Sequence, residues 1–273
     1  MKTSLKILAA LGLIAILSLG WRHYSSPPPK ELATYYKLEI TGEITPETFI
    51  KAREHLVGAA ADLKLVVINS GGGDGMSALA IGKLMHQHGW DVEVGDSCIS
   101  SCAIFIFPAG KKKYLNENSL LMFHGGPYQE NMMEMVSNFD QEIAKNGVPS
   151  DEVVLGQQDK EGTFRFVPGG PPGLDAVLDF LSMKRDSTAV ERLREFRNVS
   201  DRFYQELGVN PLLAIHGQIG IYEPLYKSYE HDGFIYRLDS MQRLGVSNIE
   251  LKNGEWHPER HPDYKMAYEV TYP

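Results

Sequence analysis

From residue 36 onward, hydrophobic positions switch repeatedly between a strand pattern and a helix pattern. Residues 36–44 alternate well enough to form a strand, and residues 63–69 form a mostly apolar run, typical of a strand buried on both faces. Between them, Thr45 and Pro46 supply an N-cap and a first-turn proline, which predict a helix to about residue 60. The first folded unit is therefore expected to be a strand, a helix and a second strand.

The same alternation continues as far as residue 126. A cluster of glycines follows the second strand, and apolar residues at helical spacing then predict a helix over 76–88. Residues 91–95 favour a short strand, 102–108 a further buried segment, and 119–124 a strand that ends on a histidine. Because strands and crossover helices recur in this order, the pattern predicts an α/β fold with parallel strands.

Beyond residue 126 the pattern is less regular. Residues 127–200 combine an acidic, methionine-rich stretch with a proline- and glycine-rich break, and we expect an inserted, mainly helical segment there. Helical composition returns at 191–207 and 211–219, and strand composition at 234–237 and 246–251. Residues 253–273 are polar and predict a loosely held tail.

The N-terminus resembles an export signal. Lys2 and Lys6 precede an uncharged apolar run, which makes residues 1–24 a signal peptide or, since the cleavage site is poor, an N-terminal membrane anchor. An anchor would use residues 7–21, although the run is short for a bilayer span. The proline-rich residues 25–35 would then be a linker to a folded domain outside the cytoplasmic membrane, periplasmic or otherwise extracytoplasmic.

Charge narrows the classes of partner. The formal net charge is −8, and the one sizeable basic run is Lys111 to Lys113, so no nucleic acid partner is expected.

Three segments carry residue types that suit nucleophilic catalysis. They are residues 69–73, 98–103 and 121–125. A serine hydroxyl needs a neighbouring base, and the sequence offers Ser101 with His124. Backbone N–H groups of Gly72, Gly73 and Cys102 would stabilise the oxyanion, with glycine present so that substrate can approach the turn. Taken singly, these residues also suit a plain turn, a helix cap and a polar strand end.

The combined pattern resembles a known family. An apolar strand leading into residues 68–73, a serine eight residues before Ala109, and a strand ending at His124 are similar to the proteolytic subunit of Clp proteases. The similarity is greater to the exported branch of that superfamily, in which cysteines flank the serine. It covers residues 63–126 well and 238–249 weakly.

The resemblance implies a Clp/crotonase-like spiral of β-β-α units over residues 36–252, with the insertion at 127–200. It also implies a serine hydrolase, a peptidase of the endopeptidase type that acts on peptides or proteins without a cofactor. Spacing to Ala109 favours Ser101 over Ser100 as nucleophile, again by resemblance. Superfamily members commonly form rings, so the resemblance also implies a homo-oligomer.

The third catalytic residue does not match the family pattern. Counting back from Gly245 leads to Tyr229 where the family has an aspartate, and of the neighbouring Glu230 and Asp232 we prefer Asp232. A Ser–Lys dyad using Lys83 or Lys111 is the alternative within the superfamily. The alternative to an enzyme is a non-catalytic module that binds a partner protein or peptide.

Cys98 and Cys102 are the only cysteines, and in an exported protein we expect them to form a disulfide rather than a redox pair or metal site. His257 and His261 have the spacing of helical metal ligands, but Pro258 interrupts any helix between them. The glycine cluster lacks the lysine of a phosphate-binding loop. No metal and no nucleotide are predicted.

Overall fold

The structure, a computed structural model, describes residues 36–60, 63–129, 173–185 and 187–273, together with 132–134, 137, 138, 141 and 145. The predicted signal or anchor, the linker, and half of the predicted insertion at 127–200 lie outside these residues. Within the described ranges, no helix has the length and apolar character needed to cross a membrane.

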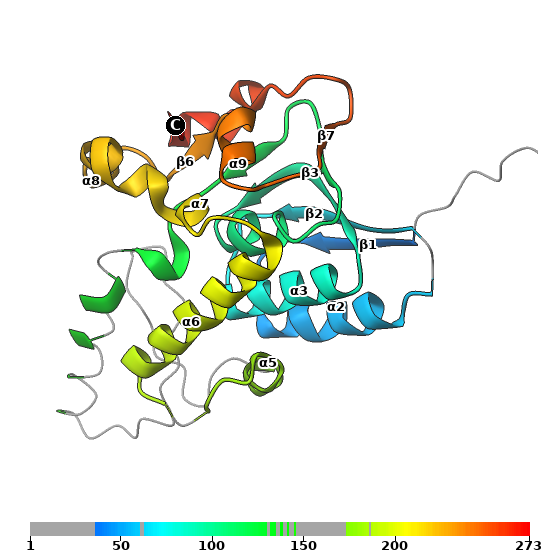
Figure 1. The fold of residues 1–273 in the computed structure, drawn as a ribbon, viewed down its shortest axis with the longest axis vertical. Helices are drawn as coiled ribbons and strands as arrows, with labels where there is room; N and C mark the ends of the chain where they lie inside the picture. The colour runs from blue at the N-terminus through cyan, green and yellow to red at the C-terminus, as the bar shows by residue number, and fades with distance from the viewer. Residues whose placement is uncertain are drawn as a thin grey trace, which may run out of the picture. The chain divides into compact units, whose positions relative to one another are not determined.

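A parallel sheet organises the fold (Figure 1). Its strands lie in the order β1-β2-β3-β4-β7, and β5 pairs with the far end of β3. All five pairings in this sheet are parallel. The strands are β1 (Tyr36–Thr41), β2 (Lys64–Ser70), β3 (Asp91–Ile99), β4 (Lys113–Leu115), β5 (Leu120–Met122) and β7 (Ile249–Leu251). The predicted α/β class with parallel strands is confirmed.

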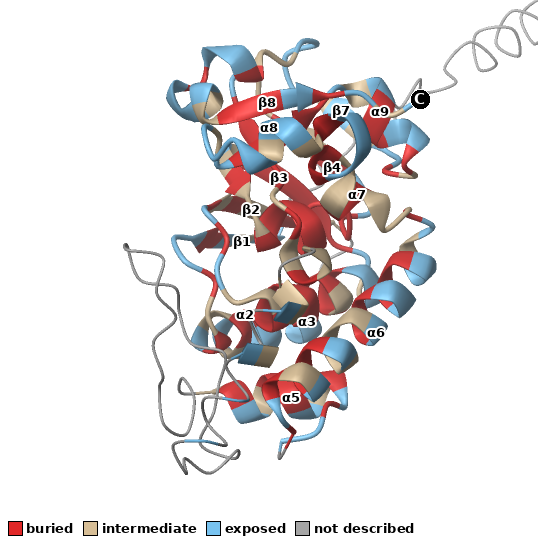
Figure 2. Cartoon of the chain, turned by 90° about the vertical axis from the view of Figure 1, so that its left-hand side faces the viewer, coloured by how far each residue is buried: buried red, intermediate tan, exposed pale blue. Residues whose placement is uncertain are grey.

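Helices α2 (Pro46–Gly58) and α3 (Gly75–Gln87) lie side by side below the strands in Figure 1. Thr45 caps α2 by accepting from the Thr48 amide, and Asp74 caps α3 by accepting from the Ser77 amide. Helices α5 (Leu174–Leu181) and α6 (Ala189–Leu207) pack against α3. Buried residues concentrate where these helices meet β2 and β3 (Figure 2).

The carboxyl-terminal part adds a small second sheet. Strand β6 (Gly233–Tyr236) pairs in parallel with β8 (Ala267–Val270). The remaining short elements are η2 (Gly126–Tyr128), α7 (Leu212–Ile215), η4 (His216–Gln218), η5 (Gly220–Tyr222), α8 (Glu223–Lys227), α9 (Leu238–Arg243), η6 (Pro258–Arg260) and η7 (Pro262–Met266). Phe123 and Phe234 exchange backbone hydrogen bonds of 2.8 Å in both directions, so the two sheets meet just after β5.

The predicted loose tail at 253–273 is wrong. Residues 267–270 form β8, and Val270 is fully buried. The apolar residues Ala267, Tyr268 and Val270 pack into the protein because β6 offers an unpaired strand edge beside them. Polar composition in the preceding residues concealed this short strand.

The buried segment predicted at 102–108 begins with a helix. A π-helix covers Cys102–Ile106, with all five residues fully buried. A short buried apolar run has no period that separates helix from strand. The strand before it is also longer than predicted, because β3 continues to Ile99.

The predicted boundary of the insertion at residue 200 falls inside α6. Phe203 and Tyr204 in its last turns are fully buried, so this end of the helix belongs to the core. The Tyr204 hydroxyl donates to the carbonyl of Ile104 over 2.9 Å. Pro108, four residues after Ile104, has no N–H, and Tyr204 supplies the donor that an α-helical residue there would have provided.

Replacing Tyr204 with phenylalanine removes that donor and leaves the buried Ile104 carbonyl without it. Tyr204→Phe is expected to lower the free energy of unfolding by about 1–3 kcal/mol in chemical denaturation. Tyr229→Phe is the matched control, because the Tyr229 side chain is 85% exposed and should leave stability unchanged. Equal stability of the two variants would contradict this role for Tyr204.

Candidate functional site

The predicted site residues follow the carboxyl ends of three adjacent parallel strands. In the sheet, Ser70 of β2 is the partner of Cys98 in β3, and Ile99 of β3 is the partner of Met122 in β5. Ser101 and His124 therefore each lie two residues beyond a paired position, and the glycine turn begins one residue beyond Ser70. Parallel pairing brings the three segments to one edge of the sheet.

The serine turn has a strained backbone. Ser100 has a positive φ of 61°, which is uncommon for a residue other than glycine, asparagine or aspartate. Its amide donates to the carbonyl of Met122 over 2.9 Å, so the turn is fixed against the end of β5. Holding a serine in this conformation costs on the order of 1–3 kcal/mol, which the surrounding contacts must offset.

The Ser101 hydroxyl is not used to stabilise the fold. Ser101 precedes the helix Cys102–Ile106 but makes no side-chain cap, contrary to its alternative interpretation as a helix cap. The residue is 5% exposed, and its Oγ has no hydrogen-bond partner. A buried hydroxyl without a partner is destabilising, so its presence calls for a role outside packing.

The glycines are required by the serine turn and its neighbours. Gly72 has φ of 95°, and a Cβ placed on it would lie 2.6 Å from the Ser100 Cβ and 2.8 Å from the Ile99 oxygen. Gly73 has φ of 141°, and a Cβ there would collide with the Ile44 backbone. Close packing of chain segments explains both glycines, whereas the sequence prediction explained them by substrate approach.

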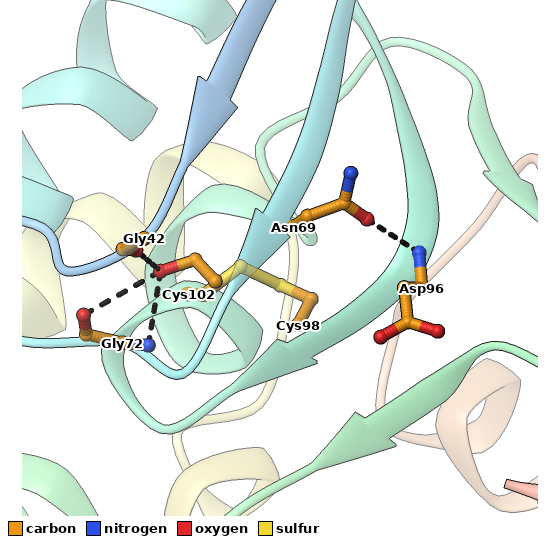
Figure 3. Close-up of a disulfide and its surroundings, with 7 residues drawn as sticks. Gly42, Asn69, Gly72, Asp96, Cys98 and Cys102 are labelled. Atoms are coloured by element: carbon orange, nitrogen blue, oxygen red, sulfur yellow. Dashed lines mark hydrogen bonds between the residues drawn. A yellow bond between two sulfur atoms is a disulfide. The ribbon is translucent and has the colours of Figure 1, made fainter.

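Asn69 and Ser70 join the surrounding strands (Figure 3). The Asn69 Oδ1 accepts from the Asp96 amide over 2.5 Å, where the register between β2 and β3 shifts. The Ser70 Oγ donates to the Gly42 carbonyl over 2.6 Å and accepts from the Gly72 amide over 3.0 Å. Neither polar side chain was predicted to have a role, although their place directly after an apolar run was a signal in the sequence.

The Ser70 contact also changes the set of oxyanion donors. Since the Gly72 N–H already donates to Ser70, it is committed within the protein. Gly73 and Cys102 are left as the predicted donors. Cys102 is the first residue of its helix, where N–H groups have no partner within the helix.

The predicted disulfide is confirmed. Cys98 and Cys102 are bonded, with Cα atoms 5.3 Å apart, and both side chains are fully buried (Figure 3). The bond links the end of β3 to the first residue of the π-helix and spans both Ser100 and Ser101. It thus closes the strained turn on both sides.

His124 lies in an environment that keeps its imidazole neutral. Burial lowers the pKa of His124 below its ordinary value of 6.5, while a hydrogen bond with its own backbone and the charge of Asp232 act in the opposite direction. A neutral imidazole at neutral pH is the form that accepts a proton.

Asp232 comes from the second sheet. It directly precedes β6, whose Phe234 is bridged to Phe123, and its amide donates to the Met266 carbonyl over 2.8 Å. Its side chain is exposed, and its charge acts on His124. Tyr229, where the family pattern has an aspartate, is 85% exposed. The structure therefore brings Asp232 close enough to influence the imidazole.

The lysines of the alternative dyad lie elsewhere. The Lys83 Nζ pairs with Glu206 of α6 at 3.5 Å. The Lys111 amide donates to Trp90, which precedes β3, so Lys111 lies at the opposite end of that strand from Ser101.

The two histidines with metal-like spacing are also separate from one another. His257 contacts Glu255 at 3.0 Å and Glu259 at 2.8 Å, whereas His261 is buried 3.5 Å from Asp96. Among the residues that the structure describes, no group of three or more histidine, cysteine or acidic side chains is arranged to hold a metal ion.

Comparison with known proteins adds no relative to this picture. No model of a protein family matches the chain, and no curated protein matches it significantly.

Proposed function

We propose that this protein is an exported serine hydrolase that cleaves peptide bonds, with Ser101 as nucleophile and His124 as base. The observation that carries the proposal is the Ser101 hydroxyl, which is buried without a partner at the sheet edge where His124 also lies. Neither the glycine turn nor the helix uses this hydroxyl, and a strained residue precedes it. Strain and unsatisfied polar groups concentrate at functional sites.

In the proposed reaction, the Ser101 Oγ attacks the substrate carbonyl carbon while the neutral His124 imidazole takes the hydroxyl proton. The Gly73 and Cys102 N–H groups stabilise the negative oxygen of the tetrahedral intermediate. The C–N bond then breaks, and the amine leaves with the proton from His124. Water then attacks the Ser101 ester while His124 takes a proton from it. The ester C–O bond breaks, and His124 returns the proton to the Ser101 oxygen. Asp232 stabilises the imidazolium that forms in both stages.

The proposed fold is the Clp/crotonase-like spiral of β-β-α units. Support comes from the parallel order β1-β2-β3 with crossover helices α2 and α3, and from β5, which pairs with the end of β3 instead of extending the sheet. In such a spiral, chain segments from successive turns would meet at the end of β3.

Export and membrane attachment are part of the proposal. The charged start and apolar run at 7–21 support a signal or anchor, and the Cys98–Cys102 bond suits an oxidising compartment. We therefore place the folded part in the periplasm or an equivalent space, with peptide or protein substrates, and self-association as a further expectation.

Partner binding without catalysis is the second candidate function. Exposed apolar side chains favour it, since Ile221 is 83% and Tyr229 is 85% exposed, with Ile219 and Leu225 in the same segment. Such a surface is typical of a site where a protein or peptide docks. This segment leads directly to Asp232, so a docked peptide would lie beside the candidate site.

A fluorophosphonate probe tests the nucleophile. The folded protein is expected to form one covalent adduct on Ser101, located by peptide mass spectrometry, because the unpartnered hydroxyl has a neutral base nearby. Ser101→Ala should abolish the adduct. Ser100→Gly is the matched control, because glycine accepts the positive φ and should leave labelling intact.

An adduct on Ser100 would reassign the nucleophile. Absence of any adduct between pH 6 and 9, a window around the ordinary histidine pKa of about 6.5, would instead favour the non-catalytic binding protein.

The pH dependence of labelling tests the base and Asp232. Because burial lowers the pKa of His124, the labelling rate should rise with pH and reach its plateau below the range of an exposed histidine. Asp232→Asn removes a charge that raises this pKa, so the rise should shift to lower pH. The plateau rate should fall by about tenfold, which corresponds to roughly 1.4 kcal/mol.

Glu230→Gln is the control for Asp232→Asn, since Glu230 is an exposed acid two residues away. An identical pH profile for Asp232→Asn and the unchanged protein would remove Asp232 from the proposed triad.

A further inference from the structure

Gln218 contacts the candidate base through its backbone. The residue ends the short helix His216–Gln218 and is 6% exposed. Its side-chain Nε2 donates to the carbonyl oxygen of His124 over 2.7 Å. Its Oε1 is buried and has no hydrogen-bond partner. One half of the amide is therefore satisfied and the other half is not.

The orientation of this amide follows from the contact itself. If the amide were turned over, its Oε1 would face another acceptor, the His124 carbonyl oxygen, at hydrogen-bond distance. With the Nε2 on His124, the Oε1 lies against Gly125, where a Cβ would collide with it. A methionine would fill the same space without burying an unpaired oxygen, but it would offer no donor to the His124 carbonyl. The bond to His124 is therefore what a glutamine provides here and an apolar side chain does not.

The backbone around Gln218 is fixed by the same residues that fix His124. Gly217 lies against the ring of Phe234, and the Tyr268 hydroxyl donates to the Gly217 carbonyl over 2.5 Å. Phe234 is bridged to Phe123, the residue before His124. Gln218 and His124 are thus both held next to the backbone bridge between Phe234 and Phe123.

The chain after His124 is poorly restrained by its own residue types. Gly125 and Gly126 follow, with φ of 99° and 54°, and glycines limit backbone rotation least. A side-chain donor on the His124 carbonyl compensates by holding the last peptide before this flexible pair.

Buried polar atoms without a partner are found on the candidate triad and on residues linked to it. In the described part of the chain, four buried side-chain atoms lack a partner, and three of them belong to Ser101, Gln218 and His231, the last being the neighbour of Asp232. A native fold keeps such atoms few. Here Ser101 belongs to the candidate triad, Gln218 is hydrogen-bonded to His124, and His231 adjoins Asp232 in the sequence.

We propose that Gln218 is a positioning residue, which fixes the His124 peptide so that the imidazole is held in place to accept the Ser101 proton. The inference rests on the proposed hydrolase and adds to it a residue that touches neither substrate nor the reacting atoms.

Gln218→Met tests this role in the full folded chain. Labelling of Ser101 by the fluorophosphonate should slow by about ten- to a hundredfold, the scale of a misplaced catalytic group. The midpoint of thermal unfolding should change little, because removal of the unpaired buried oxygen offsets the loss of the donor to the His124 carbonyl. The His124 ring proton signals in the NMR spectrum should shift. Gln242→Met, at an exposed position of α9, is the matched control and should change none of these.

Three results would overturn the proposal. One is a labelling rate in Gln218→Met that equals the rate of the wild-type protein. This result would contradict the role of Gln218 but not the proposed hydrolase. Another is a slower rate with an equally reduced folded fraction, which would make Gln218 a residue of the fold alone. A wild-type protein that takes no label would remove the hydrolase itself, whatever the variant shows.

Discussion

The pairing of β3 with two partners at its carboxyl end is the constraint on which the candidate site depends. Cys98 is paired with β2 on one side and with β5 on the other. Because both pairings are parallel, the segments that leave these strands emerge at the same edge. Ser101 and His124, 23 positions apart in the sequence, reach the same edge of the sheet only through this arrangement. The glycine turn after β2 leaves the sheet at that edge as well.

Several hydrogen bonds stabilise this edge of the sheet, and each joins a different pair of chain segments. Asn69 joins β2 to β3 where their register shifts, and Ser70 joins the glycine turn to the end of β1. The amide of Ser100 joins the serine turn to β5. These bonds offset the conformational strain of the Ser100 backbone, and none of them uses the Ser101 hydroxyl.

Much of the first half of the fold could be predicted from the sequence, because its strands are apolar runs and its helices begin with recognisable caps. Thr45 with Pro46 marked the start of α2, and the glycine cluster marked the turn before α3. The hydrophobic pattern could not identify the π-helix at 102–106, since five consecutive apolar residues carry no period, and a helix here was expected only from the family resemblance around Ser101. Strand β8 was missed because its stability comes from β6, more than thirty residues away in the chain. Gln218 had no sequence signal at all, as its contact with His124 depends on the meeting of the two sheets.

The complete burial of both bonded sulfurs has a consequence for the life of the protein. Thiol–disulfide exchange requires direct attack on a sulfur atom, and in the folded chain neither Cys98 nor Cys102 presents one to solvent. Oxidation must then take place while the polypeptide is still open. Afterwards the cross-link is insulated from small reductants, and the shape of the turn no longer depends on the redox state of its surroundings.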